Sequence, residues 1–321
     1  MHPDKKSPLW TMGGAVLIAL LAPFIMPMNI ATEILIFGIF AASTNLLLGV
    51  SGLYSFGQAA FFGIGGYVAG YCFAQGGIPL GAGLLLAVLA GASVAGLVGA
   101  ISIRRTGIYF MMLTFAFNQM IYYIAYSWSS VTGGEDGLTG IERPGIAIPG
   151  LGVFDISQDA NFYVLAAVLF LASLLFLYRL THSPLGLVLE AAKHNPRRTA
   201  SIGYSVYKVQ VYAFVVSGAL AGLAGGLYSM LYRIMPIDAI SWHNSASVVF
   251  MVVIGGMGNI LGPVFGAAIF IWLQGLLSLT WARWPLLFGL FIIVAVLFFR
   301  GGVVELLTRI RMYASKQKGS A

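Results

Sequence analysis

Long apolar runs are the feature that most constrains what this chain can fold into. Two examples are Phe162 to Leu180 and Pro285 to Phe299, each close to the ~20 residues that a helix needs to cross about 30 Å of hydrocarbon. Only 8% of the residues are charged, whereas a soluble domain carries roughly a quarter. A water-soluble fold could not cover its surface with so few charges. We therefore expect an all-α, polytopic helical membrane bundle.

Small residues and a single cysteine narrow the class further. The 41 glycines let helices approach closely where burial against lipid supplies little driving force. Because no long polar linker interrupts the chain, we expect one transmembrane domain over residues 1–321. Cys72 lies in an apolar run and is the only cysteine, which excludes disulfide frameworks and cysteine-based metal sites.

The first apolar stretch, Leu9 to Met28, follows Lys5 and Lys6 and so resembles a secretory signal peptide. It is long for the core of such a peptide, contains two prolines, and is followed at once by further apolar runs rather than by a small-residue cleavage pattern. We expect it to stay as the first helix.

Charge positions orient the chain, since Lys and Arg remain on the cytoplasmic side of short loops. Five of the ten acidic residues occupy the segment 129–160, where Arg143 is the only basic side chain. We therefore expect segment 129–160 to be a periplasmic loop, segment 181–208 to be cytoplasmic, and both termini to be cytoplasmic. The basic clusters behind this orientation are Lys5 and Lys6, Arg104 and Arg105, Arg179 to Lys208, and Arg300 to Lys318.

This orientation is consistent with about ten transmembrane helices, although eight is a possible count. The eighth run is too short to span normally, and the glycines and proline between Gly255 and Pro263 break it. A short or discontinuous helix is tolerable only where protein or a water-filled path surrounds its free backbone. The expected spans lie near residues 10–28, 30–50, 53–74, 78–103, 109–128, 161–180, 209–235, 247–256, 264–280 and 284–300.

A weak internal echo pairs Ala60 to Tyr67 with Ala221 to Tyr228, both rich in glycine and ending in tyrosine. One interpretation is an internal duplication, as many transporters contain. Generic small-residue helix packing is the other, and the sequence leaves both open.

The cytoplasmic segment contains a well-marked short helix, with Ser183 as N-cap, Pro184 at its first position and Asn195-Pro196 as its stop. Its apolar stripe comprises Leu185, Val188, Leu189 and Ala192. Such a helix docks into a groove on a partner, or lies in the lipid headgroups, held by Arg197 and Arg198.

Polar side chains within the spans are candidates for a substrate path, because they are costly in hydrocarbon. Thr114, Asn118 and Tyr122 lie four residues apart on one helix face, with Gln119 on its flank. Hydrogen bonding between helices is the alternative role for all of them.

Ser55 and Gln58 follow a glycine-loosened stretch that predicts a broken helix end, whose free backbone N–H groups could meet a carboxylate. In the periplasmic loop, the glycines around Glu135 and Asp136 suit a turn that contacts a docking protein, or a purely structural turn. One acidic pair lacks the alternating oxygen ligands of a calcium loop, and we expect no metal site.

Several blocks in this order and spacing resemble LivM-type permeases of branched-chain amino acid ABC importers. The resemblance spans roughly residues 38–300. In the cytoplasmic segment, Glu190-Ala191-Ala192 and Gly203 resemble the EAA-x-x-x-G coupling signature of importer permeases, although the glycine lies farther from the triplet than in that signature. The matching blocks are Ser51 to Tyr67, Gly107 to Gln119, Thr132 to Leu138, Ser183 to Gly186, Ala213 to Gly226, and Ile254 to Pro263.

The resemblance implies an import complex in the bacterial inner membrane, with a LivH-type permease, LivG- and LivF-type ATPases and a periplasmic substrate-binding protein. It assigns ten residues to ATPase coupling: Ser183, Pro184, Leu185, Gly186, Val188, Leu189, Glu190, Ala191, Ala192 and Gly203. No G-x-x-x-x-G-K-[ST] phosphate loop occurs in the chain, so ATP and Mg are expected on partner subunits and no cofactor here. Membrane lipid is a further partner, and no nucleic acid is expected.

Two other functions were weighed against transport driven by partner ATPases. An enzyme would need clustered catalytic or metal-binding groups, whereas the four histidines are scattered through loops and tails. An ion-coupled secondary transporter of a small polar solute is the serious alternative, but such carriers usually hold an intramembrane carboxylate, and no acidic residue falls in the middle of an expected span. The identity of the carried solute is not readable from this chain.

Overall fold

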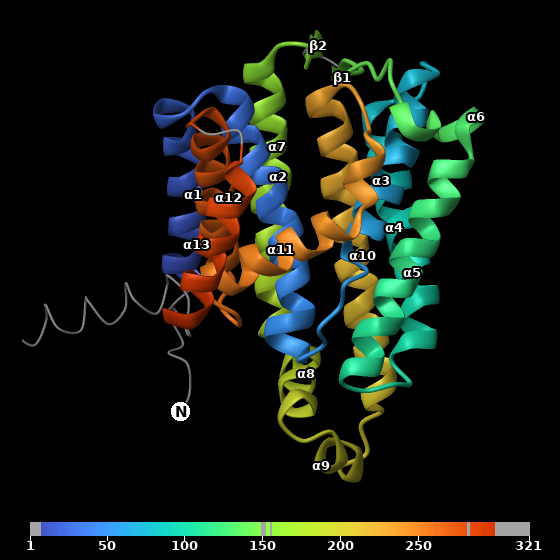
Figure 1. The fold of residues 1–321 in the computed structure, drawn as a ribbon, viewed down its shortest axis with the longest axis vertical. Coiled ribbons are helices and arrows are strands. Elements are labelled where there is room, and N and C mark those ends of the chain that lie inside the picture. The colour runs from blue at the N-terminus through green and yellow to red at the C-terminus, as the bar shows by residue number, and fades with distance from the viewer. Residues whose placement is uncertain (1–7, 149–151, 155, 281–282, 299–321) are drawn as a thin grey trace, which may run out of the picture.

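The computed structural model describes residues 8–148, 152–154, 156–280 and 283–298, and these form a bundle of helices (Figure 1). The α-helices are α1 (Pro8–Ile25), α2 (Met28–Asn45), α3 (Gln58–Ala74), α4 (Leu80–Ser102), α5 (Ile108–Ser127), α6 (Ser129–Thr132), α7 (Asp159–Thr181), α8 (Pro184–His194), α9 (Pro196–Ser201), α10 (Val206–Tyr232), α11 (Trp242–Gly255), α12 (Gly262–Thr280) and α13 (Trp284–Phe298). The shorter elements are the π-helix η1 (Leu46–Ser51), the 3-10 helices η2 (Gly134–Asp136) and η3 (Ile237–Ile240), and a hairpin of β1 (Ile146–Ile148) and β2 (Gly152–Phe154).

The all-helical architecture agrees with the prediction from apolar runs, apart from the small hairpin. Each of the ten expected segments contains a helix, and six helices in the described residues are long and apolar enough to cross a membrane. The chain is therefore a multi-pass membrane protein, while the count of ten crossings stays a prediction. The six are Met28–Ser51, Leu80–Ser102, Ile108–Ser127, Asp159–Thr181, Val206–Tyr232 and Gly262–Leu279.

The two polar segments used to orient the chain lie at opposite ends of the bundle. Helices α8 and α9 project from one end, whereas the hairpin and α6 lie at the other (Figure 1). This separation is what the charge pattern requires, and the side that each end faces stays a prediction. The basic clusters at Lys5 and Lys6 and from Arg300 to Lys318 lie outside the described residues.

The first helix packs against the bundle rather than standing apart from it. α1 contacts α7 and α2, and the Tyr163 hydroxyl donates a hydrogen bond of 2.6 Å to the carbonyl oxygen of Ala19. The stretch that resembles a signal peptide is thus one of the packed helices of this structure.

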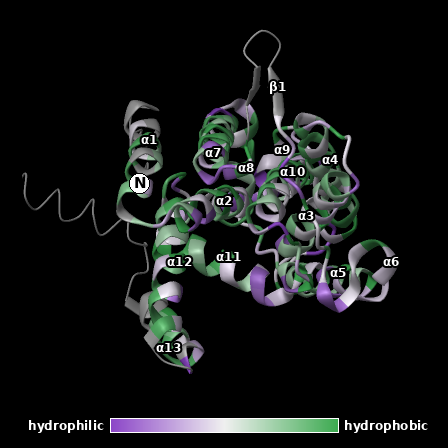
Figure 2. Ribbon diagram, turned by 90° about the horizontal axis from the view of Figure 1, so that it is seen from above, coloured by the Kyte–Doolittle hydropathy of each residue, from purple (hydrophilic) through white to green (hydrophobic). Residues whose placement is uncertain are grey.

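The centre of the bundle is formed by α2 and α10, which Figure 2 shows surrounded by other helices. Glycines set their packing. A Cβ on Gly65 would collide with the backbone of Gly222, and one on Gly225 would collide with the carbonyl of Phe62. The two echoing segments from the sequence therefore lie against each other in the α3–α10 interface, which favours the helix-packing interpretation of the echo.

Two segments interrupt the helices inside the bundle. η1 extends α2, the chain turns at Gly52 with φ of 70°, and α3 begins only at Gln58. The expected span over 53–74 is therefore helical only from Gln58, because residues 52–57 leave the helix at this positive φ. The second interruption, residues 233–241, connects α10 to the short helix α11, which runs across the bundle (Figure 1).

The orientation of the chain can be tested by labelling engineered cysteines in a Cys72→Ala background. Ser157 and Ala200 are both exposed, whereas the adjacent Thr199 is buried and would be shielded from reagent. We expect an impermeant maleimide added to intact spheroplasts to label a cysteine at position 157 and not one at position 200. Labelling of position 200 alone would contradict the orientation.

Candidate functional site

A buried polar cluster surrounds the start of α3, inside the bundle. Asn118 of α5 is fully buried, and its Oδ1 accepts a hydrogen bond of 2.9 Å from the Ala60 backbone N–H. Its Nδ2 donates a bond of 2.9 Å to the carbonyl oxygen of Ile240, at the end of η3. One side chain thus pairs backbone groups of both interrupted segments.

Other side chains complete the capping of α3. The hydroxyl of Ser245, on α11, accepts from the Ala59 N–H at 2.9 Å. Thr114 Oγ1 accepts from the Phe56 N–H at 3.2 Å, and Ser55 Oγ accepts from the Gly57 N–H at 3.2 Å. The first N–H groups of a helix have no partner within it, so these contacts replace the water that would otherwise bind them.

Gln58 lies beside this cluster with half of its amide unpaired. Its Oε1 lies 3.2 Å from the hydroxyl of Ser217 on α10, which also donates to the Ser43 carbonyl at 2.8 Å. Its Nε2 is buried and has no hydrogen-bond partner among the described residues. An unpaired buried donor costs about 1–3 kcal/mol, so this nitrogen is a candidate contact for a passing acceptor.

The six path candidates separate into two groups. Ser55, Gln58, Thr114 and Asn118 are buried in the cluster, and most of their polar atoms bond to other parts of the chain. Gln119 and Tyr122 lie at its edge and are only partly buried. For Ser55, Gln58, Thr114 and Asn118, these contacts favour a role in hydrogen bonding between helices. That any of the six residues lines a substrate path stays a prediction.

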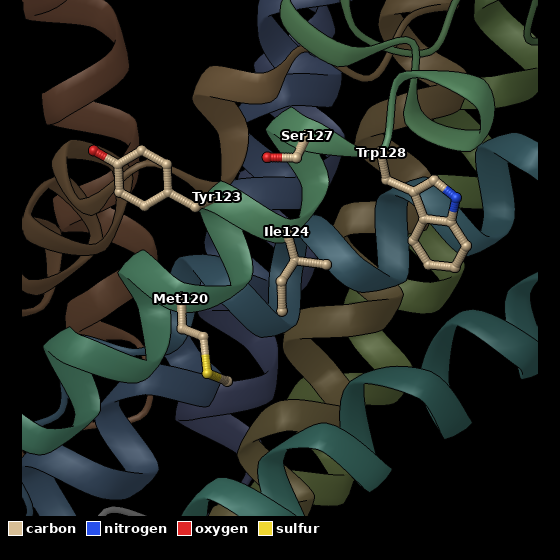
Figure 3. A pocket seen from close by; sticks show the side chains of 5 residues that line it. All are labelled: Met120, Tyr123, Ile124, Ser127 and Trp128. Carbon is tan, nitrogen blue, oxygen red and sulfur yellow. The ribbon is translucent and has the colours of Figure 1, made fainter.

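A pocket on the exposed face of α5 is separate from the polar cluster. It has a volume of about 550 Å³ and is lined by Met120, Tyr123, Ile124, Ser127 and Trp128. Figure 3 shows these side chains along successive turns of α5, with Tyr123 and Trp128 pointing to opposite sides. Its walls are mainly apolar and none of the path candidates lines it, so it suits lipid or a neighbouring helix better than a polar solute.

Helix α8 has the ends that the sequence predicts. Ser183 is its N-cap and accepts from the Gly186 N–H at 3.5 Å, Pro184 is its first residue, and it ends at His194 before Asn195. The sequence did not predict that α9 follows directly. Asn195 caps α9 by accepting a hydrogen bond from the Arg198 N–H at 3.0 Å. The Asn-Pro pair that ends α8 is therefore also a signal for the start of a second helix.

Three of the four residues in the apolar stripe of α8 face this chain's own bundle, whereas Leu185 is 39% exposed. Val188, Leu189 and Ala192 are buried, Leu189 to 1% exposure, and α8 packs on η1, α10 and α7. These side chains satisfy their apolar surface internally and are not available to a partner. Gly186 is buried as well.

The exposed face of α8 contains the remaining coupling candidates and one residue that the sequence argument missed. Leu187 is 62% exposed and was passed over because it lies off the apolar stripe. Gly203, with φ of 92°, has no neighbour near its Cβ position. The exposed candidates on α8 are Pro184, Leu185, Glu190 and Ala191.

A lysine ties α8 to the interrupted helix above it. Lys193 Nζ donates a hydrogen bond of 2.6 Å to the carbonyl oxygen of Gly49 in η1. In turn, Asn45 Nδ2 donates to the Asn259 carbonyl at 2.9 Å, and its Oδ1 accepts from the Gly258 N–H at 3.0 Å. The cytoplasmic helix, η1 and the turn between α11 and α12 are thus connected by side-chain bonds.

The outer turn contains Glu135 and Asp136 in η2, both exposed. Glycines at positions 133, 134 and 137 have positive φ, which this tight turn requires. Tyr126 Oη lies 3.5 Å from Glu135 Oε2. The described residues contain no group of three His, Cys, Asp or Glu that could hold a metal.

Arg143, noted in the sequence only for its charge, fastens the outer ends of two helices. Its guanidinium donates to the carbonyls of Met230 and Leu231 at 3.0 and 3.2 Å, at the end of α10. It also pairs with Asp159, the first residue of α7, at 2.8 Å. A cation is favourable at a helix C-terminus and an anion at an N-terminus.

Comparison with known proteins identifies relatives of this chain. The family described as branched-chain amino acid transport system / permease component matches residues 26–299. The high-affinity branched-chain amino acid transport system permease proteins LivM of Salmonella typhimurium and Escherichia coli are 27% and 26% identical over 279 residues, which is 80% of this chain and 65% of theirs. The chain therefore spans about two thirds of the length of these relatives.

A third relative is matched over more of its own length. The protein named "probable branched-chain amino acid transport permease protein LivM" in Methanocaldococcus jannaschii is 26% identical over 295 residues, covering 79% of this chain and 83% of its own. No solved structure matches the chain.

The buried cluster predicts different consequences for two adjacent amides. Asn118→Leu should leave the Ala60 N–H and the Ile240 carbonyl without partners, at about 1–3 kcal/mol each. Gln119→Leu removes an Oε1 that has no partner and should not lower stability. We expect thermal unfolding of the purified protein to shift downward for Asn118→Leu only. Equal melting temperatures for the two variants would rule out the capping role.

Proposed function

Because the chain belongs to the family of branched-chain amino acid transport system permease components, we propose that it is the membrane-spanning permease subunit of an ATP-binding-cassette importer. It translocates branched-chain or related amino acids across the bacterial inner membrane, using ATP that partner subunits hydrolyse. The family match over residues 26–299 carries this proposal, since it includes every helix from α2 to α13. The chain is a transport subunit rather than an enzyme.

The proposed partners are those that the resemblance to LivM-type permeases implies. Permeases of this family work with ATPase and further subunits. We assign to this chain a LivH-type permease, LivG- and LivF-type ATPases and a periplasmic substrate-binding protein. Exposed acidic side chains on the outer turn, Glu135 and Asp136, support docking of that binding protein at this end. ATP and Mg are held by the ATPases.

The solute path is proposed to pass the polar cluster around α3. Inside a helix bundle, free backbone groups are available to bind a solute only where a helix is interrupted. Both interruptions meet at Asn118, and the unpaired Gln58 Nε2 lies beside them. Movement of α3 against α5 and η3 would free these groups for a solute, so the capping contacts and the path role belong to different states.

The exposed face of α8 is the proposed contact with an ATPase. Leu187, Glu190 and Ala191 lie three and four residues apart, on the side opposite the buried stripe. The bond between Lys193 and Gly49 supports transmission of motion from α8 to η1, immediately before the first interruption. The apolar face of α8 therefore packs against its own bundle, and the opposite, exposed face is available to the ATPase.

Transport by the complete complex tests the proposed function. Proteoliposomes containing this chain with its cognate permease, ATPases and binding protein should take up L-leucine, L-isoleucine or L-valine only when ATP is supplied on the ATPase side. The chain alone with an ion gradient should be inert. Uptake by the isolated chain under a proton or sodium gradient would instead establish the ion-coupled carrier.

Two leucines on α8 separate coupling from folding. Leu187→Asp should weaken ATPase association by roughly 30- to 150-fold, or about 2–3 kcal/mol, if this side chain is a central contact. Leu189→Asp should instead destabilise the chain itself, because it buries a carboxylate against η1 and α10. The measurements are co-purification of the ATPases in detergent and the melting temperature. Wild-type ATPase retention and substrate-stimulated hydrolysis in Leu187→Asp would reject this face as the docking surface.

A further inference from the structure

The second interrupted segment contains an acidic residue, Asp238, in the short helix η3, which packs against α3 and α5. Met235 pairs with Leu138 through two backbone hydrogen bonds at the outer end, and Ile240 bonds to Asn118 at the middle of α5. Asp238 lies between these two points. From the sequence this residue falls beyond the end of an expected span, whereas in the structure its segment packs against α3 and α5.

The Asp238 side chain is exposed on this single chain and makes no ion pair with any described residue. A carboxylate at membrane depth costs about 2.5–3.5 kcal/mol or more. Asp159, at the start of α7, has a cationic partner in Arg143. Asp238 has none within the part of the chain that the structure describes.

The helices that η3 packs against, α3 and α5, each contribute a tyrosine on this side of the bundle, and α10 contributes a third. Tyr67 of α3, Tyr122 of α5 and Tyr228 of α10 are all within electrostatic range of its carboxylate. The Tyr67 side chain is 8% exposed, and its hydroxyl is buried with no hydrogen-bond partner among the described residues. An unpaired buried hydroxyl costs stability, so this oxygen is a candidate contact for a solute.

We propose that Asp238, Tyr67 and Tyr122 form a subsite for the primary ammonium group of the transported solute. This subsite rests on the proposed function, because an amino acid zwitterion carries such a group. An ammonium has three donors and no acceptor, which suits a carboxylate and two hydroxyl oxygens. Tyr122 also stacks on Tyr126, with ring centroids 6.3 Å apart, and such rings attract cations through their faces.

The position of the subsite gives it a distinct task along the path. It lies between the outer end, where the binding protein is proposed to dock, and the start of α3, whose N–H groups are suited to the carboxylate of the same solute. A zwitterion entering from outside thus meets an ammonium site first and an anion site deeper in. The alternative occupant of Asp238 is a cationic side chain of the second permease.

The experiment uses the complete reconstituted complex, with L-leucine as the probe. Asp238→Asn should lower ATP-dependent uptake by about 10- to 100-fold, the range expected for loss of a charge-assisted bond, with assembly and basal ATP hydrolysis unchanged. Asp238→Glu should retain more uptake than Asp238→Asn. Glu142→Gln removes the same charge from an exposed site on the same side and should transport like the wild type.

Tyr67→Phe supplies a second variant that does not depend on the tolerance of Asp238 to substitution. It deletes only the unpaired hydroxyl, so the melting temperature should stay equal or rise while uptake falls about threefold to tenfold. A purely structural hydroxyl predicts the opposite pattern.

Two results would overturn the subsite. The first is wild-type uptake in Asp238→Asn. The second is loss of the partner permease from Asp238→Asn together with wild-type uptake in Tyr67→Phe, which would assign Asp238 to an ion pair between subunits. If the wild-type complex imported none of the three branched-chain amino acids, the proposed function would fail and the subsite would fall with it.

Discussion

The pairing of backbone groups inside the bundle is the constraint on which the rest of this structure depends. Hydrocarbon offers no hydrogen bonds, so each N–H or C=O freed by an interrupted helix needs a partner from the protein. α3 begins within the bundle and frees several of these groups at once. Asn118 pairs one of them and also the last carbonyl of η3. Because each interruption supplies part of the other's environment, neither could be replaced by a regular helix without exposing polar atoms elsewhere.

The same requirement explains why the interior is so rich in glycine. Side-chain amides and hydroxyls reach backbone groups on other helices only when the helix axes are close together. Gly65, Gly222 and Gly225 remove the side chains that would keep α3 from α10. The glycines between α3 and α10 and the polar cluster at the start of α3 therefore depend on each other, because close helix packing brings the hydrogen-bonding groups into range.

Much of the fold followed from the sequence, and the reasons for the remainder are physical. Apolar runs and charge clusters located the helices, because length and hydropathy report directly on a slab of hydrocarbon. The caps of α8 followed from Ser183 and Pro184. The orientation of its stripe did not, since an apolar face does not reveal whether it meets its own bundle or a partner. Asn118 was recognised as a polar residue in mid-span, but its bonds to Ala60 and Ile240 depend on segments far away in the chain. Asp238 was not predicted as a site residue, because hydropathy cannot show that a connecting segment packs against α3 and α5.

Arg143 has a consequence for how the bundle can move. At the outer end it joins the last carbonyls of α10 to the first residue of α7, and at the inner end the same two helices are linked through α8 and α9. The two helices are therefore joined at both ends, by side-chain bonds at one and by the chain itself at the other. We expect α7 and α10 to shift together when α8 is displaced, so that the 27 residues of α10 carry part of that motion to the opposite end of the bundle.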